Sequence, residues 1–402
     1  MLKKLIYSIA AHHHPWRKLS FDELAELYTS MTMRSLGFSL IGIFVPVYLY
    51  TTGISLQAIY LFFAFFFLLR IPVSFAAGLV VGRIGPKHSI ALSTMLFIVF
   101  LGLLTSYEVM GWPLWLLSTA YTLANGLFFI AYNTDFSKIN HSVHGGKELG
   151  WLMIFERAGG ALGPVVGGLL AGLFAPQASM IFAIIVLAIS LVPLFLTNEP
   201  VKTHQKIDYL PFNNRKYARD FVAFSSYSIV NVANGLLWPL LVAVFIFTDG
   251  TYEKLGALVG LGLAVSIISA RMFGVFIDKK RGKSLLRFGV YFNVIVSVCR
   301  SAIDTAGGAL AGTLLAEPVA LAYRMPVSKG YYDTADSIKG KRIVYLVWGE
   351  SWGALAKSIF LFAMAAACIW MNEVTVLRAS FIVVGVVGLA MLAQRFPALK
   401  QV

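Results

Sequence analysis

The sequence predicts an all-α membrane protein with twelve transmembrane helices. Composition, continuous apolar runs and the placement of charge are the three observations that predict it. Of the 402 residues, 58% are hydrophobic and 13% are charged, and the mean hydropathy is +0.77. A soluble globular protein has about 45–50% apolar and about 25% charged residues. This composition excludes a soluble enzyme, a nucleic-acid-binding module and a disordered chain.

The apolar runs are long enough to cross a bilayer. A transmembrane helix needs about 20 largely apolar residues to span roughly 30 Å of hydrocarbon. The runs are continuous, whereas the strands of a membrane β-barrel alternate between apolar and polar residues. The stretch from Tyr60 to Leu69 is typical, since no charged residue interrupts it before Arg70. In chain order, the twelve predicted spans are 28–50, 57–81, 89–107, 113–133, 150–174, 179–197, 221–246, 255–277, 284–304, 306–328, 342–370 and 374–394.

The segments outside the spans are short. Met1 to Ala11 resembles the first two regions of a signal peptide, but the histidine-rich stretch that follows does not fit a cleavage site. We therefore predict a cytoplasmic amphipathic lead-in. Cys299 and Cys368 fall inside predicted spans and indicate neither a disulfide nor a metal site. The predicted division is a lead-in at 1–27, six-helix bundles at 28–197 and 221–394, a cytoplasmic linker at 198–220 and a cytoplasmic tail at 395–402.

The positive charge is distributed very unevenly between the two sides of the membrane. The chain has 33 Lys and Arg residues against 19 Asp and Glu residues, a formal net charge of +14. Of these cations, 24 lie in the lead-in, the tail and the even-numbered loops, while the opposite side holds only Lys254 and Arg378. Lys and Arg collect in cytoplasmic loops. The asymmetry predicts cytoplasmic termini in a multi-pass protein, for which we expect a prokaryotic cytoplasmic membrane, and it requires no nucleic-acid partner.

The two halves of the chain repeat each other. GLVVGRIGPK begins at Gly78, and GVFIDKKRGK begins at Gly274, after the second and eighth predicted spans. Two further places match in the same order. The matched pairs are Gly78 with Gly274, Tyr132 with Tyr323 and Glu156 with Glu350, at offsets of 196, 191 and 194 residues. Three matches at nearly one offset indicate an internal repeat of half the chain.

These motifs resemble those of the major facilitator superfamily over essentially the whole chain. The loop signature of that family, G-x-x-x-D-R-x-G-R-R, follows its second span and recurs in degenerate form after the eighth. Here the second copy keeps the acid as Asp278, whereas the first has Gly82 in its place. The resemblance implies two pseudo-symmetric six-helix bundles that transport a small solute by alternating access. The residues that it assigns to the gating motif are Gly78, Arg83, Gly85, Gly274, Asp278, Lys279 and Gly282.

Small residues in the fifth span predict close helix packing. Gly163 to Gly168 spell GPVVGG, which is similar to a G-P-x-x-G-G signature found in many antiporters of the family. Gly159, Gly163 and Gly167 lie four residues apart, and such a stripe lets another helix approach closely. Pro164 removes a backbone hydrogen bond and permits a bend. By resemblance, the fifth and eighth spans meet between the halves, so the stripe serves either rocking or ordinary tight packing.

Several charged residues fall within predicted spans, where a structural or functional role must offset the cost of burying each charge. A charge at the bilayer centre costs at least about 2.5–3.5 kcal/mol on the insertion scale. Those within spans include Arg70, Glu156, Arg157, Arg324 and Lys357. The resemblance implies that the first, fourth, seventh and tenth spans line a central cavity. The cavity candidates are then Arg34, Asn125, Tyr132, Asn231, Asn234, Trp238, Glu317 and Tyr323.

Structural roles compete with these functional ones. Glu317 could pair with Arg70 or Lys357 as a structural carboxylate. Arg300 and Asp304 have the four-residue spacing of a helical ion pair. The tyrosine, tryptophan and asparagine side chains could serve packing or interhelical hydrogen bonds instead of a binding site. The charges in the cytoplasmic thirds of their spans could form gates or snorkelled pairs; they are Arg34, Glu156, Arg157, Arg324 and Glu350.

The intramembrane carboxylates suggest a coupling ion. A carboxylate in a low-dielectric setting can hold and release a proton near neutral pH, and Glu317 is the first candidate, before Glu350 and Asp135. Cations outnumber central acids, which favours an anionic or zwitterionic substrate. We expect a monomeric, proton-coupled secondary transporter, with antiport or efflux favoured by the GPVVGG motif. Uniport and a lipid or lysolipid flippase on the same fold are the alternatives.

An enzyme is not expected. The sequence contains no H-E-x-x-H and no G-x-S-x-G at a plausible strand-to-helix elbow. The stretch from Ile277 to Ser284 resembles the end of a phosphate-binding loop, but it lacks the first glycine and joins two apolar helices. We therefore expect no cofactor and no metal.

Overall fold

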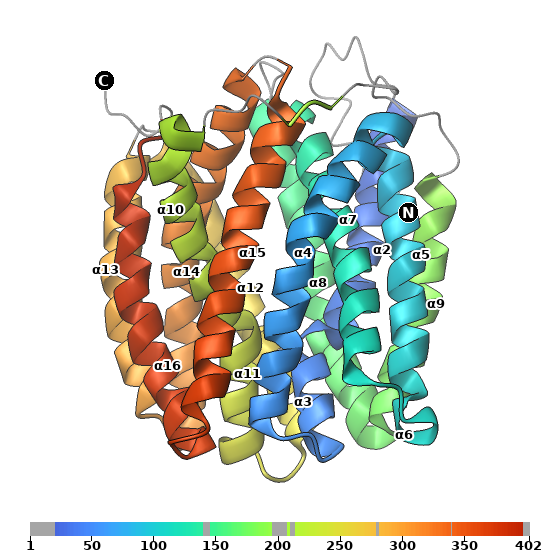
Figure 1. Ribbon diagram of the computed structural model, residues 1–402, viewed down its shortest axis with the longest axis vertical. Coiled ribbons are helices and arrows are strands. Elements are labelled where there is room, and N and C mark those ends of the chain that lie inside the picture. The colour runs from blue at the N-terminus through green and yellow to red at the C-terminus, as the bar shows by residue number, and fades with distance from the viewer. Residues whose placement is uncertain are drawn as a thin grey trace.

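A computed structural model of the chain shows a bundle of helices that run side by side along its long axis (Figure 1). The structure describes residues 21–139, 145–194, 207–209, 214–278, 281–338 and 340–396. Within these ranges, side chains are described except at 21–28, 135–139, 145–158, 194, 214 and 275–278. Every regular element in the described ranges is helical, as the continuous apolar runs predict.

The helices of the first half correspond to the first six predicted spans. Between α2 and α3 the helix is interrupted, because Pro46 lacks an N–H and its ring clashes with the carbonyl of Gly42, four residues earlier. The helices are α2 (Phe21–Gly42), α3 (Phe44–Thr51), α4 (Leu56–Ile84), α5 (Pro86–Thr105), α6 (Tyr107–Met110), α7 (Leu114–Ile139), α8 (Gly145–Leu173) and α9 (Pro176–Leu194).

The second half follows the same order, with one irregular span. The seventh span consists of α10 (Asn214–Val232), the π-helical η1 (Ala233–Leu237), α11 (Trp238–Leu241) and the π-helical η2 (Val242–Ile246). The remaining elements are α12 (Thr251–Asp278), α13 (Gly282–Ser301), α14 (Ala306–Ser337), α15 (Arg342–Ala367), α16 (Glu373–Gly388) and the 3₁₀-helical η3 (Leu389–Ala393).

The described helices thus form twelve membrane-length segments, each overlapping one predicted span. Nine of them are long and apolar enough to qualify as candidate spans by composition. The other segments are α8, in which the part with described side chains, Gly159–Leu173, is a shorter apolar helix, and α13 and α15, which carry three charged residues each. The outer surface is apolar: Leu79, Ile185 and Ile268 are among its exposed side chains, as expected for lipid contact.

Two helices from different halves lie side by side through the middle of the bundle. Figure 1 shows α4 and α15 adjacent to each other, with most of each half on its own side. Along this seam the Ser358 hydroxyl donates to the Ala64 carbonyl at 2.9 Å, and the Gln57 amide donates to the Ala365 carbonyl at 3.1 Å. A second contact between the halves joins α8 and α12. The described core consists of a large apolar cluster that includes Tyr48 and Tyr323 and a smaller one that includes Met31 and Val347.

The turn between α4 and α5 consists of one residue. Gly85 ends α4 and precedes Pro86, the first residue of α5, and its φ is +87°. That backbone conformation is open to glycine and strained for residues with a Cβ. The glycine of the predicted loop motif is therefore required by the turn itself.

Candidate functional site

Polar side chains from four helical segments meet inside the second half. We call this group the C-half cluster. Its centre is Arg300, near the C-terminal end of α13. Arg300 is 5% exposed, and its side chain reaches Asn234 of η1. Its members are Asn234 (η1), Trp238 (α11), Arg300 (α13), and Thr313, Glu317 and Tyr323 (α14).

Hydrogen bonds link the members in one direction. The Arg300 Nη1 donates to the Asn234 Oδ1 at 2.5 Å, and the Asn234 Nδ2 donates to the Tyr323 hydroxyl at 3.0 Å. The Arg300 guanidinium lies over the Trp238 ring, 4.3 Å from its centroid. The indole Nε1 donates to the Thr313 Oγ1 at 2.9 Å. Trp238 is thereby fixed on one edge while its face holds the guanidinium.

Glu317 is the carboxylate of this cluster. It is half-buried and interacts electrostatically with Arg300, Tyr323 and Arg324. Its Cγ lies opposite Gly262 of α12, where an added Cβ would meet it at 3.2 Å. Among the described residues, Glu317 has no hydrogen bond and no ion pair within 4.0 Å. The carboxylate faces two cations and is fixed by neither.

The backbone around Asn234 is irregular for an identifiable reason. Pro239 provides no N–H for the carbonyl of Gly235, and the helix widens into the π-helical segment η1 just before it. Single π-helical turns occur frequently at functional sites, because the extra residue turns a side chain onto a new face. Here Asn234 lies in that segment. Asn231, one turn earlier, is half-buried with a buried amide oxygen that has no partner among the described residues.

In the first half, a buried arginine is also held on an aromatic ring. The Arg34 Nε donates to the Thr94 Oγ1 at 3.1 Å, and the guanidinium lies 3.2 Å from the centroid of the Phe128 ring. Tyr132 stacks on the same ring at 5.4 Å. Asn125 lies nearby on α7 and is 6% exposed, with an Nδ2 that lacks a partner among the described residues.

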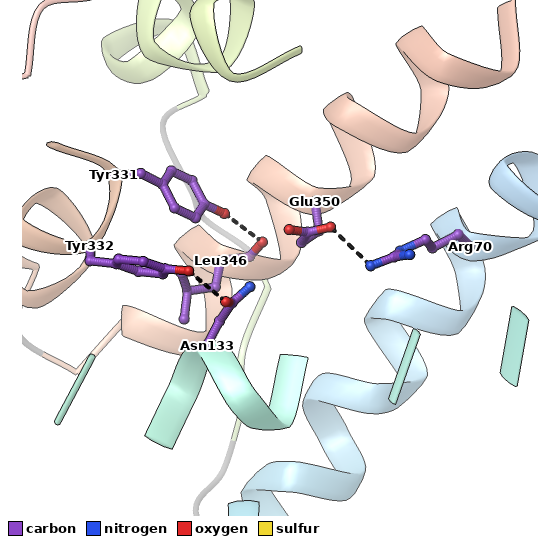
Figure 2. A network of polar contacts seen from close by, with 6 residues as sticks. All are labelled: Arg70, Asn133, Tyr331, Tyr332, Leu346 and Glu350. Atoms are coloured by element: carbon purple, nitrogen blue, oxygen red, sulfur yellow. Dashed lines mark hydrogen bonds and ion pairs between the residues drawn. The ribbon is translucent and has the colours of Figure 1, made fainter. Parts of the chain in front are cut away.

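A third group lies on the seam between the halves, and we call it the seam cluster. The Arg70 Nη2 of α4 contacts the Glu350 Oε2 of α15 at 3.3 Å, and both side chains are at most 9% exposed. Figure 2 shows this pair bridging the two helices. The Arg70 guanidinium also lies 4.3 Å from the Phe129 centroid, and the Lys357 ammonium lies 4.3 Å from that of Phe67. Arg70 is therefore neutralised by a carboxylate from the other half.

At one end of the seam, further polar contacts join the halves. The Tyr332 hydroxyl of α14 donates to the Asn133 Oδ1 of α7 at 2.8 Å, and beside it, within the second half, the Tyr331 hydroxyl donates to the Leu346 carbonyl at 3.0 Å (Figure 2). Tyr209 of the linker donates its hydroxyl to the Phe75 carbonyl at 2.6 Å. Burial raises the pKa of Tyr209 to about 12, so the hydroxyl remains a donor at neutral pH.

Gly78 makes the Tyr209 contact possible. An added Cβ at Gly78 would collide with the Tyr209 hydroxyl and would lie 3.0 Å from a Val347 methyl. This first glycine of the predicted gating motif lies where α4, α15 and the linker meet. Of the other motif residues, Arg83 is exposed, Gly282 is buried and Gly274 has open space beside it. The Asp278 side chain and all of Lys279 lie outside the described residues.

The glycines of α8 serve two different neighbours. Cβ atoms added at Gly159, Gly163 and Gly167 would strike the backbone or side chains of α2, within the same half. Gly168 instead faces α12, where an added Cβ would lie 3.2 Å from the Gly256 Cα. A Cβ added at Gly256 would in turn collide with the Pro164 carbonyl oxygen. The four-residue stripe thus packs the first half together, and the contact with α12 of the other half includes Pro164, Val165, Gly168 and Gly172.

Two of the predicted pairings are wrong. Asp304 pairs with Arg378 of α16 instead of Arg300, because α13 ends at Ser301 and the four-residue spacing holds only inside a helix. Glu317 pairs with neither Arg70 nor Lys357, since Arg70 contacts Glu350.

Some predicted site residues lie outside the part of the chain whose side chains are described: Asp135, Glu156 and Arg157. The structure also adds residues that the sequence prediction omitted, namely Arg300 and Thr313. An intramembrane arginine on the ninth span was a signal, but its spacing to Asp304 assigned it elsewhere.

The fold and the interior define a class of protein: a helical membrane protein of two repeated halves, with charged side chains buried inside and along their seam. A model of the Major Facilitator Superfamily matches residues 27–323, and the chain belongs to that family. The family and its fold are those of transporters.

Solved structures of similar fold agree. FucP, a Major Facilitator Superfamily transporter in the outward conformation, is 14% identical, with a TM-score of 0.63 over 92% of this chain and 96% of that one. The human organic anion transporter MFSD10 (TETRAN) is 12% identical, with a TM-score of 0.66 over 93% of this chain and 99% of that one. A second structure of FucP, described as the E. coli fucose:proton symporter, is 15% identical, with a TM-score of 0.61 over 91% and 97%. No curated protein sequence matches this chain significantly.

Proposed function

We propose that this protein is a proton-coupled secondary transporter that carries a small organic anion by alternating access between its two halves. The observation that carries the proposal is how the buried cations are held. Arg34, Arg70, Arg300 and Lys357 each lie on an aromatic ring, at 3.2–4.3 Å from its centroid. Among the described residues, Arg300 and Lys357 have no carboxylate within ion-pair distance, whereas Arg70 has Glu350.

Holding a cation on a ring differs from pairing it with an acid. The ring face attracts the cation through its quadrupole and fixes its position, and the contact is worth about 0.5–2 kcal/mol. The positive charge itself is not cancelled. In an interior of low dielectric, such a charge remains available to a mobile anion. The excess of cations over the carboxylates Glu317 and Glu350 therefore favours an anionic solute, the kind of solute named for the fold relative MFSD10.

Glu317 is the residue that we propose for proton coupling. It interacts electrostatically with Arg300 and Arg324 and forms an ion pair with neither. Glu350 is instead committed to Arg70 at 3.3 Å and is better suited to holding the halves together. Breaking the Arg70–Glu350 pair would accompany rocking of the two halves.

The direction of coupling has two candidates. The GPVVGG motif, whose Pro164 and Gly168 contact α12, favours antiport or efflux. The charge cluster favours symport, because a protonated Glu317 repels an anion less than an ionised one. We further propose that the protein acts as a monomer in a prokaryotic cytoplasmic membrane, with its termini in the cytoplasm where the positive loops collect.

Uptake into proteoliposomes tests this function. We expect radiolabelled benzoate, pyruvate or succinate to accumulate when a pH gradient is imposed, and a Glu317→Gln variant to lose that accumulation while retaining exchange of bound anion. Acidifying the side from which the anion enters drives symport, whereas acidifying the opposite side drives antiport. Uphill uptake that is unchanged in Glu317→Gln would contradict the coupling role. Protein stabilised by lysolipids alone, with no flux of any anion, would favour the flippase alternative.

A further inference from the structure

Arg300 has more hydrogen-bond donors than partners. Its guanidinium presents five N–H groups, and the hydrogen bond to Asn234 Oδ1 uses one of them. The Arg300 Nε is buried and has no partner among the described residues, although the residue as a whole is only 5% exposed. A buried donor without a partner costs about 1–3 kcal/mol and more when it is charged. An acceptor that binds during part of the working cycle would satisfy this donor.

The hydrogen bonds of the cluster end on a second donor. Arg300 donates to Asn234 and Asn234 donates to Tyr323, so the tyrosine hydroxyl has already accepted a hydrogen bond. Its own proton has no acceptor among the described residues. Arg300 and Tyr323 therefore both present donors in the same cluster, and an oxygen-rich anion is the ligand that matches them.

Open space lies beside one residue of the π-helical segment. Gly235 follows Asn234 in the π-helical segment, is exposed in the middle of the seventh span and has no atom within 4 Å of an added Cβ. Asn234 itself is half-buried. The described residues therefore leave a position unfilled directly after Asn234, the residue that accepts a hydrogen bond from Arg300.

We propose that Arg300 and Tyr323 bind the carboxylate group of the transported anion, and that Glu317 takes up a proton as that carboxylate binds. Asn234 and Trp238 act as positioning residues, because they fix the guanidinium from the amide side and the ring side. The inference rests on the proposed function and names the position of its substrate. It also favours symport over antiport, since anion and proton bind to the same state.

The proton uptake follows from the charges that face Glu317. These are Arg300 on α13, and Tyr323 and Arg324 on its own helix α14; α12 presents the uncharged Gly262. With the site empty, an ionised Glu317 balances part of the positive charge. A bound carboxylate takes over that balance, and two anions beside the same cations repel each other. Protonating Glu317 removes the repulsion.

Binding to the purified full-length protein tests this site separately from transport. The probes are sodium benzoate, sodium pyruvate and sodium succinate, with benzamide as the uncharged analogue of benzoate, and the readouts are thermal stabilisation and calorimetry. We expect at least one carboxylate to bind and benzamide not to bind. The planar guanidinium of arginine can donate two parallel hydrogen bonds to a carboxylate, and the ammonium group of lysine cannot. Arg300→Lys should therefore weaken binding about tenfold, and Arg300→Gln should weaken it more. Arg271→Gln, at an exposed position on α12, is the matched control and should bind like the wild type.

Proton uptake is measured by repeating the calorimetry in buffers of different ionisation enthalpy. We expect close to one proton taken up per carboxylate bound by the wild type and none by Glu317→Gln, which should still bind. Equal affinity of the wild type and Arg300→Gln, or no binding of any of the three carboxylates, would overturn the assignment. If carboxylates are transported in proteoliposomes and Arg300→Gln binds them normally, the proposed function survives and this site falls. If a carboxylate binds through Arg300 but no flux occurs, the site survives and the transport function falls.

Discussion

Two buried arginines of the molecule, Arg70 and Arg300, have opposite kinds of partner. Arg70 of the first half meets a carboxylate of the second half, Glu350, and together they cross the seam between α4 and α15. Arg300 of the second half meets a neutral amide, Asn234, and a neutral ring, Trp238. A charged partner cancels the charge and joins two helices, whereas a neutral partner fixes the cation and leaves its charge available. This difference assigns Arg70 to holding the two halves together and Arg300 to the proposed binding of a ligand.

The largest effect is expected at the seam. Arg70→Gln leaves the Glu350 carboxylate buried and unpaired, and removing one partner of a buried pair typically destabilises a protein by about 3–5 kcal/mol. The double variant Arg70→Gln with Glu350→Gln should recover most of that loss, because no buried charge is left alone. Unfolding of the purified variants in detergent, followed by intrinsic fluorescence, gives the comparison. A double variant as unstable as Arg70→Gln would show that the pair is not a unit.

The next prediction gives Arg300 the kind of partner that Arg70 has, a carboxylate. Asn234→Asp has nearly the shape of the native residue and places a carboxylate 2.5 Å from the Arg300 Nη1. The new ion pair should neutralise Arg300 and weaken benzoate binding by about 1.4 kcal/mol or more, which is tenfold in affinity. The protein should unfold at an unchanged or higher temperature. Calorimetry at neutral pH measures the affinity for benzoate. Undiminished binding by Asn234→Asp would contradict the claim that the positive charge of Arg300 binds the anion.

Arg300→Gln should abolish carboxylate binding with little effect on folding. The lost hydrogen bond to Asn234 is worth about 0.5–1.5 kcal/mol, and removing an uncompensated buried cation offsets it. We expect the free energy of unfolding to stay within about 1 kcal/mol of the wild type, in contrast to Arg70→Gln. A loss as large as that of Arg70→Gln would mean that the two arginines do the same structural work.

The smallest effect is expected where the linker docks on the seam. Tyr209→Phe removes the hydrogen bond to the Phe75 carbonyl but keeps the ring contact, and should cost about 0.5–1.5 kcal/mol. Because burial raises the pKa of Tyr209 from 10.0 to about 12, its contribution to stability is complete below pH 10 and is lost as the pH rises through 12. The stability difference between wild type and Tyr209→Phe should therefore shrink across that window. A stability difference between the two proteins that does not change with pH up to 12 would indicate that the Tyr209 hydroxyl is exposed to water.

Much of the fold follows from the sequence. Each of the twelve predicted spans overlaps a helical segment, because a continuous apolar run can satisfy its backbone in lipid only as a helix or a closed barrel. The break between α2 and α3 and the π-helical segment η1 also follow from the sequence, because Pro46 and Pro239 each lack the N–H that a regular helix needs. The predicted bundle boundaries and the lead-in remain predictions.

The site was less accessible from the sequence. Arg300 and Asp304 satisfy a spacing rule that fails because α13 ends at Ser301 between them. The ring contacts of Arg34 and Arg70 with Phe128 and Phe129 join residues far apart in the chain, and no spacing encodes them. The glycine stripe of α8 was visible, but only the packing shows that most of it faces α2. Partner identity is a property of the assembled bundle.

The central claim is that the cation held by neutral groups binds the transported anion. The most direct test is the accumulation of benzoate, pyruvate and succinate in proteoliposomes under an imposed pH gradient, for the wild type, Arg300→Gln and Arg271→Gln at matched protein content. We predict that the wild type and Arg271→Gln accumulate at least one of these anions and that Arg300→Gln accumulates none. Equal accumulation by Arg300→Gln and the wild type would contradict the account.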